Sequence, residues 1–283
     1  MGILRQYPHI ILPPMYTDTF DRYIGRESLV HRLDPRLKVV VALVFILATA
    51  LLPDGAWLGF LLSWLLMWGL TRLAQLPYRV VWKRALVIVP FLLAVVTVLV
   101  NVPGTAVFTW QFGPLTLTIS DAGLVRFVSI LMRGWLAVQV AILLTAVTPF
   151  PDLMHALTHL RVPAILVNII SFMYRYLFVL ADEAQRLMRA RQARSVRLPG
   201  TGRHGGSLFW RAQVTGHMVG QLFSRSLERS DRVYNAMLAR GYQGRMLTIN
   251  PHVMRRFDWL AGGTAVSMIV LIQLIARSDL HIH

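Results

Sequence analysis

Two arginine-centred tripeptides have the residue types and the spacing that could do chemistry in this chain. They occupy residues 193–195 and 239–241, and each places an arginine beside small residues. A planar guanidinium makes forked hydrogen bonds to carboxylates, and small neighbours let the backbone of a partner approach closely. The presence of two such tripeptides predicts a docking partner that is present in two copies. The residues are Ala193, Arg194 and Ser195 in the first tripeptide, and Ala239, Arg240 and Gly241 in the second.

A second pair of arginines, Arg126 and Arg133, lies within an apolar run. They are seven residues apart and therefore share one face of a helix. An arginine inside a membrane is energetically costly and usually faces protein or water. Two interpretations remain open: a polar seam that contacts another membrane subunit, or internal pairing that orients the helices of this chain.

Asp152, His155 and His159 follow one another at helical spacing, so one face could present three metal ligands. The alternative is a short solvated or interfacial helix, and we favour it. We therefore predict no metal bound by this chain.

The composition indicates a polytopic membrane protein. Of 283 residues, 55% are hydrophobic and 15% are charged. The net charge of +16 comes from 29 Lys and Arg against 13 Asp and Glu, and the cations cluster outside the apolar runs. The positive-inside rule explains this charge without a nucleic-acid partner. The absence of cysteine excludes disulfides and thiolate metal sites.

No motif for ATP hydrolysis or other catalysis is present. A P-loop requires Gly-Lys followed by Ser or Thr, but Lys38 and Lys83, the two lysines of the chain, follow Leu and Trp. Any ATP chemistry must come from another chain.

Five apolar runs predict transmembrane helices, although several are short for a full span. The first is opened by Asp34 and Pro35, which suit the N-cap and the first helical position. The connection at 101–123 contains no Lys or Arg and is predicted to be an external loop. Loop charges place the N-terminus in the cytoplasm and the C-terminus outside. The predicted spans are 37–52, 55–70, 85–102, 124–147 and 259–276.

The apolar run at 165–180 is interpreted differently. As a span it would place 181–258, with 14 arginines against 5 acidic residues, outside the cell. We therefore predict two long cytoplasmic helices, at about 165–197 and 207–240. Gly241 suits the position just after the second helix.

These two helices have charged surfaces. Asp182 and Glu183 precede Arg186 by four and three residues, a spacing that predicts local ion pairs. The excess of arginine over acidic residues indicates acidic partners on other chains.

Four segments, in this order, resemble the transmembrane coupling subunit of energy-coupling factor (ECF) transporters, most closely its cobalt and nickel branch, CbiQ. They are "HRLDPRLK", "TPFPDLMHALTHLRVP", "FMYRYLFVLADEAQRLMRARQARS" and "NAMLARGY". The resemblance extends from about residue 18 to the last span. It implies that 193–195 and 239–241 end two coupling helices, and that each docks on one of two ATPase subunits (CbiO/EcfA-like). Ser195 stands where the family pattern has glycine.

The resemblance implies an all-α polytopic membrane protein with about five transmembrane helices and two cytoplasmic coupling helices before the last span. Its regions would be an N-terminal cytoplasmic segment (1–36), a four-helix transmembrane region (37–147), a coupling-helix region (148–258), and a last transmembrane helix with an external tail (259–283).

The resemblance also implies a non-catalytic subunit of a bacterial inner-membrane importer for cobalt or nickel. ATP and Mg would bind the ATPase subunits, and this chain would bind no cofactor. Other partners would be a metal-capturing membrane subunit (CbiM-like) and a small accessory membrane subunit (CbiN-like). Alternatives are the same scaffold in a vitamin importer, an intramembrane enzyme around Arg126 and Arg133, or a basic anchor for nucleic acid or anionic lipid at 181–258.

Overall fold

The computed structural model describes most of the chain, in two structural units. One unit comprises Met1–Leu160 and Pro251–His283, and the other Arg161–Asn250. The described residues are 23–26, 28–86, 90, 95–97, 103, 105–112, 115–194, 207–244 and 254–280.

The first unit is built mainly from helices. Asp34 caps α3 by accepting a hydrogen bond from the Arg36 N–H at 2.9 Å, and Pro35 occupies the first helical position, as predicted. Ser120 caps α7 in the same way, through the Gly123 N–H at 3.0 Å. The helices are α2 (Leu29–Arg32), α3 (Pro35–Ala50), α4 (Trp57–Leu73), α5 (Tyr78–Ala85), α7 (Asp121–Val147), α8 (Phe150–His159) and α11 (Arg256–Leu280).

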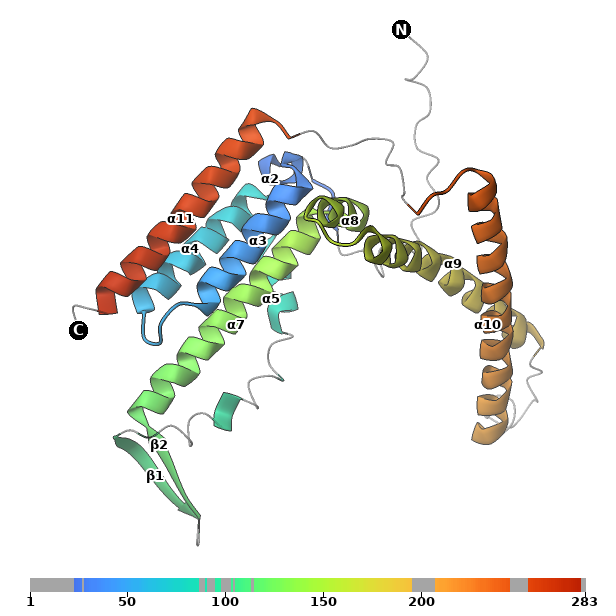
Figure 1. Ribbon diagram of the computed structural model, residues 1–283. Coiled ribbons are helices and arrows are strands. Elements are labelled where there is room, and N and C mark those ends of the chain that lie inside the picture. The colour runs from blue at the N-terminus through green and yellow to red at the C-terminus, as the bar shows by residue number, and fades with distance from the viewer. Residues whose placement is uncertain are drawn as a thin grey trace. The chain divides into compact units, whose positions relative to one another are not determined.

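Four of these helices, α3, α4, α7 and α11, lie side by side as a bundle (Figure 1). Helix α3 contacts α7, α8 and α11, while α4 contacts α7 and α11. Phe45, Phe60, Met67, Leu136 and Leu143 are buried between them. Inside a membrane such helices are held by close van der Waals packing, because lipid tails are as apolar as the side chains.

Two glycines bring α11 close to its neighbours. A Cβ atom on Gly59 of α4 would lie 2.7 Å from the Cβ of Ala276, and one on Gly262 would lie 2.3 Å from Leu37 Cδ1 of α3. Small residues at such contacts are typical of helix packing in membranes.

A β-hairpin precedes α7 where the sequence analysis predicted a loop. Strands β1 (Ala106–Phe112) and β2 (Leu115–Ser120) pair antiparallel, with Trp110 opposite Leu117. Both strands are rich in β-branched and aromatic residues, which favour strands. The sequence analysis assigned no secondary structure to this external loop, so the hairpin is an addition to it.

The second unit consists of α9 (Ala164–Arg194) and α10 (Leu208–Ala239). The bounds of α10 agree with the predicted 207–240 to within one residue at each end. The predicted end of the preceding helix, near residue 197, lies outside the described residues. The two helices run in opposite directions and cross (Figure 1), since a residue late in α9 contacts one early in α10.

An all-α polytopic membrane protein is confirmed. Helices α7, α9 and α11 are long and apolar enough to cross a membrane, and α4 is a shorter apolar helix. The predicted span at 85–102 lies mostly outside the described residues. Length and composition alone would also allow α9 to cross a membrane, so its cytoplasmic placement stays a prediction from charge.

Candidate partner-docking site

Arg240 lies at the C-cap of α10, in a turn that requires glycine at the next position. Gly241 has φ +80° and donates its N–H to the Leu238 carbonyl at 2.9 Å. The Tyr242 N–H reaches back to the Met237 carbonyl at 3.0 Å. These two bonds form a Schellman motif, which satisfies carbonyls at the helix end. The second tripeptide is therefore a rigid helix terminus with an exposed arginine.

Arg194 is the last residue of α9 that the structure describes, and its side chain is exposed, as is Ala193. Ser195 lies outside the described residues. Within the described part of the chain, neither Arg194 nor Arg240 has a side-chain hydrogen bond or ion pair. Both guanidinium groups are therefore available to a partner.

Asn168, near the start of α9, holds the turn that follows Arg240. Its side-chain amide donates to the Gly244 carbonyl at 2.8 Å and to the Tyr242 hydroxyl at 3.3 Å. The position of Arg240 is therefore fixed by α9 as well as by its own helix. The sequence analysis did not predict this contact.

Two side-chain contacts brace α9 against α10. Arg225 donates to the Glu183 carboxylate at 2.7 Å, and Arg191 donates to the Thr215 hydroxyl at 3.1 Å. The predicted local pair between Glu183 and Arg186 is wrong, because the facing helix supplies a closer partner. The separation of 42 residues between Glu183 and Arg225 gives no signal of this pairing in the sequence.

The two arginines lie at opposite ends of the helix pair. Arg194 is three residues beyond Arg191, which contacts Thr215, whereas Arg240 is 25 residues beyond Thr215 along α10. A helix rises 1.5 Å per residue, so about 37 Å of α10 separates the two contact points. A single protein domain would not make equivalent contacts with both ends, whereas two domains could.

Arg126 and Arg133 meet the same carboxylate. Arg133 donates to Asp54 at 2.7 Å and to the Leu52 carbonyl, and Arg126 lies 3.7 Å from Asp54. The turn between α3 and α4 is thereby tied to α7. This is the internal pairing that the sequence left open. Arg126 keeps 57% of its side chain exposed, so a contact with another membrane subunit stays a prediction.

The three candidate metal ligands do not gather into a metal site. Among the described residues, no group of three or more His, Cys, Asp or Glu side chains could hold a metal ion. His155 Nε2 lies 3.4 Å from the Arg36 guanidinium, and the ring of His159 packs edge-on against His155. Helix α8 uses His155 to contact α3.

A cluster of charged residues at the start of α3 joins several helices of the first unit. The Asp34 N–H donates to the Asp258 carboxylate of α11 at 3.3 Å. Lys38 donates to the carbonyls of His31 at 3.0 Å and of Val147, the last residue of α7, at 3.4 Å. Together with the Arg36 contact to α8, these bonds connect α3 to α7, α8 and α11. They explain why charged residues occur in the segment "HRLDPRLK" at the edge of an apolar run.

Comparison with known proteins agrees with this architecture. The family model of the cobalt transport protein CbiQ matches residues 26–249. A transmembrane protein EcfT of an energy-coupling factor transporter, from Acidaminococcus fermentans, is 28% identical over 274 residues, covering 92% of this chain and 98% of the relative. An EcfT from Lacticaseibacillus paracasei is 28% identical over 266 residues, 90% and 96% of the two chains. The cobalt transport protein CbiQ of Rhodobacter capsulatus is 30% identical over 147 residues, 52% of this chain and 57% of its own.

The matched region contains α3, α4, α7 and both helices of the second unit. It therefore includes the two helix ends at Arg194 and Arg240 and the ion pairs of Asp54. The intramembrane enzyme considered from the sequence is excluded by this membership. The chain belongs to the CbiQ cobalt transport family, and it is a transmembrane component of an energy-coupling factor transporter, not an enzyme.

Proposed function

We propose that this chain links two ATPase subunits to a substrate-specific membrane subunit in an ATP-driven cobalt or nickel importer. The observation that carries the proposal is the pair of exposed arginines, Arg194 and Arg240, at the C-terminal ends of two antiparallel helices. Each guanidinium suits an acidic pocket on one ATPase subunit, and central arginines are frequent hot spots of protein interfaces.

The helix pair is suited to convert motion between two ATPase subunits into motion of helices. If the subunits approach on ATP binding and separate after hydrolysis, the two arginines move relative to each other. That motion shears α9 against α10 at the Glu183–Arg225 contact. In sequence, the second unit lies between α8 and α11, both of which contact α3. Motion of the second unit that passes along the chain, through α8 or through α11, therefore reaches α3 of the bundle.

Cobalt or nickel is the proposed cargo, supported by the cobalt transport family model and by the relative named CbiQ. A vitamin is the alternative that the sequence resemblance left open, and the relatives with greater coverage are named for the energy-coupling factor transporter without mention of cobalt. Uptake of radioactive cobalt, nickel and candidate vitamins by cells with and without the gene distinguishes these cargoes. Loss of metal uptake alone supports the proposal, and loss of vitamin uptake alone contradicts it.

We place the chain in the bacterial inner membrane, with the N-terminus and the second unit in the cytoplasm and the C-terminus outside. The 14 arginines against 5 acidic residues in 181–258 support this orientation. Because the chain has no cysteine, single cysteines can be introduced without background. A cysteine at Gln243 should react with a membrane-impermeant thiol reagent only after the cells are opened. Labelling in intact cells would contradict the orientation.

The docking proposal is tested by co-purification from native membranes in mild detergent. The double variant Arg194→Glu, Arg240→Glu should lose the ATPase subunits while keeping the substrate-specific subunit. The double variant Arg186→Glu, Arg232→Glu is a matched control, with the same charge change at exposed positions on the same two helices. Equal loss in both variants would attribute the effect to net charge, and retention in both would contradict docking by these arginines.

A further inference from the structure

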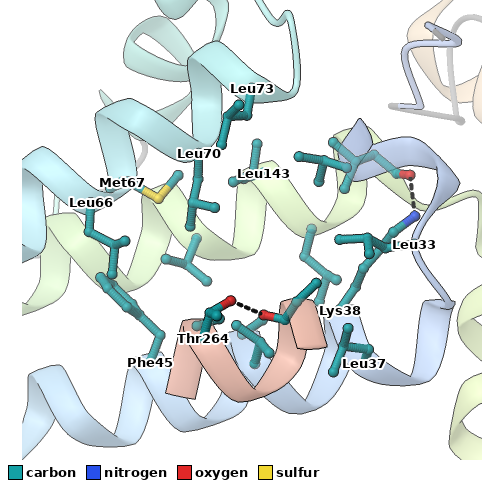
Figure 2. Close-up of a pocket in the computed structure, with 18 of the residues that line it drawn as sticks. Leu33, Leu37, Lys38, Phe45, Leu66, Met67, Leu70, Leu73, Leu143 and Thr264 are labelled. Carbon is teal, nitrogen blue, oxygen red and sulfur yellow. Dashed lines mark hydrogen bonds between the residues drawn. The ribbon is translucent and has the colours of Figure 1, made fainter. Parts of the chain in front are cut away.

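An apolar cavity of about 380 Å³ lies within the helical bundle of the first unit. Its floor is formed by α3 and α7, through residues that include Phe45 and Leu143. Its walls are the second half of α4, with Leu66, Leu70 and Leu73, and the first half of α11, with Thr264 (Figure 2).

The cavity exists because α4 and α11 are in close contact at one end and separated at the other. At the closed end, Gly59 approaches Ala276 so closely that a Cβ would lie 2.7 Å from the alanine Cβ. At the open end, Leu73 and Phe257 line the cavity with 55% and 58% of their surfaces exposed. The result is a wedge that opens toward the start of α11.

The walls offer almost no polar group to a ligand. Lys38 is the one charged residue among the described residues that line the cavity, and its ammonium already donates to the His31 and Val147 carbonyls. The Thr264 hydroxyl donates to the Ala261 carbonyl of its own helix at 3.0 Å. An occupant of the cavity must therefore be apolar.

The open end of the wedge has a basic rim. Arg255 and Arg256 directly precede Phe257, and Arg72 directly precedes Leu73; all three arginines are exposed. Arg72 is held by the ring of Trp68, 4.7 Å from its guanidinium carbon. In the described part of the chain, the side chains of Arg255 and Arg256 have no ion pair or hydrogen bond.

Arg255 directly precedes α11 and Arg256 is its first residue, so both also lie at the positive end of the helix dipole, which favours anions. The Asp258 carboxylate there is already engaged with the backbone N–H groups of Asp34 and Arg255, at 3.3 and 2.8 Å. An additional anion at this position would be attracted by both arginines and by the helix terminus.

The basic rim decides between two classes of apolar occupant. A helix with its side chains is about 10 Å across and rises 1.5 Å per residue, so about 380 Å³ would hold roughly one turn. A helix of another subunit could place only that turn within the cavity and brings no anion to the three arginines, whereas a hydrocarbon chain with an anionic headgroup matches both the apolar walls and the rim. We propose that the wedge binds one acyl chain of an anionic phospholipid, whose phosphate lies among Arg72, Arg255 and Arg256.

The test uses the full chain with its co-purified partners, reconstituted in nanodiscs of phosphatidylcholine and phosphatidylglycerol. The probe is phosphatidylglycerol with a photoreactive diazirine on one acyl chain, and the same diazirine on phosphatidylcholine is the neutral control. After illumination, mass spectrometry locates the labelled residues. We expect phosphatidylglycerol to label wedge residues such as Leu70 and Met268 well above phosphatidylcholine.

Three variants separate the contribution of the apolar cavity to lipid labelling from that of the arginines at its open end. Ala265→Phe fills the cavity and should abolish labelling there. The double variant Arg255→Gln, Arg256→Gln should lower it about tenfold, since each basic residue near an anionic lipid contributes appreciably to binding. Arg277→Gln, an exposed arginine at the other end of α11, should leave it unchanged.

Equal labelling by the two lipids, or unchanged labelling in the arginine double variant, would overturn the proposal. Labelling of a peptide from another subunit at Met268 in place of lipid would overturn it as well. Because the arginine variants alter only exposed side chains, the proposal stays testable even if Ala265→Phe fails to fold. Failure here would not affect ATPase docking, which depends on the second unit.

Discussion

The side chains of Asn168 and Tyr242 meet at 3.3 Å, although 74 positions separate them in the sequence. This bond joins the start of one long helix to the turn that ends the other. The same amide donates to the Gly244 carbonyl. The turn after Arg240 is therefore part of a closed hairpin, and the orientation of one proposed docking arginine depends on the helix that bears the other.

Loss of the Asn168 amide should loosen this turn. Each of its two hydrogen bonds contributes about 0.5–1.5 kcal/mol, so Asn168→Ala should cost more than Tyr242→Phe, which removes one of them. Hydrogen exchange of the backbone amides at 241–244 is the measurement. Equal exchange in wild type and Asn168→Ala would show that the turn is held by the Schellman motif alone.

The Glu183–Arg225 ion pair should be repaired by exchanging its charges. Glu183→Arg and Arg225→Glu should each weaken contact between α9 and α10, by about 0.2–1 kcal/mol because the pair is partly exposed, and by more where like charges are brought together. The double variant should restore the contact. ATP hydrolysed per cargo molecule transported is the readout: if the pair transmits motion, both single variants hydrolyse ATP with less transport. No recovery in the double variant would argue against a direct coupling role.

Gly59 should tolerate no side chain. Gly59→Ala places a Cβ 2.7 Å from that of Ala276 and 2.9 Å from Leu52 Cδ2, and overpacking of this kind costs about 1–3 kcal/mol. Gly69→Ala is the matched control on the same helix, because a Cβ there meets nothing within 4 Å. Thermal unfolding in detergent should show a lower midpoint for the first variant only. Equal midpoints would mean that α11 can shift away without loss.

Arg133 should matter for stability more than Arg126. Arg133 makes a close ion pair and a carbonyl contact, and charge-assisted bonds of this kind contribute about 1.5–3 kcal/mol. Arg126 is more exposed and more distant from Asp54, so Arg126→Gln should cost at most about 1 kcal/mol. Comparing the unfolding midpoints with those of Asp54→Asn tests the internal pairing. If Arg126→Gln instead releases the substrate-specific subunit at unchanged stability, the seam interpretation is supported for that residue.

His31 should make the first unit less stable in acid. Burial, helped by the nearby charges of Lys38 and Arg26, lowers the pKa of His31 below its usual value of 6.5, against the opposing effect of its hydrogen bond to Ile24. The unfolded chain then binds a proton at His31 more readily than the folded one. The contribution of His31 to stability is therefore complete above about pH 6.5 and is lost as the pH drops through the lowered pKa. Unfolding midpoints across this range should fall less steeply for His31→Gln than for wild type. The exposed His217→Gln serves as the control and should keep the wild-type slope.

The sequence predicted the features that depend on local chemistry. Asp34 and Pro35 start α3, and Gly241 follows α10, because caps and left-handed turns restrict the residue types that can occupy them. Contacts between distant segments left no such signal. Glu183 had a suitable partner at helical spacing in Arg186, yet it pairs with Arg225 in the folded chain. Likewise, hydrophobicity and loop charge could not distinguish an irregular external loop from the hairpin of β1 and β2.

The central claim is that each end of the helix pair touches an ATPase subunit. A photoreactive amino acid at Ala193 or Ala239, the exposed neighbours of Arg194 and Arg240, tests it without removing either arginine. Illumination of native membranes should crosslink both positions to ATPase subunits, whereas probes at the exposed positions Asp182 and Glu228 in the same helices should give much less product. Crosslinks from 193 and 239 to other proteins, or to no protein, would contradict the account.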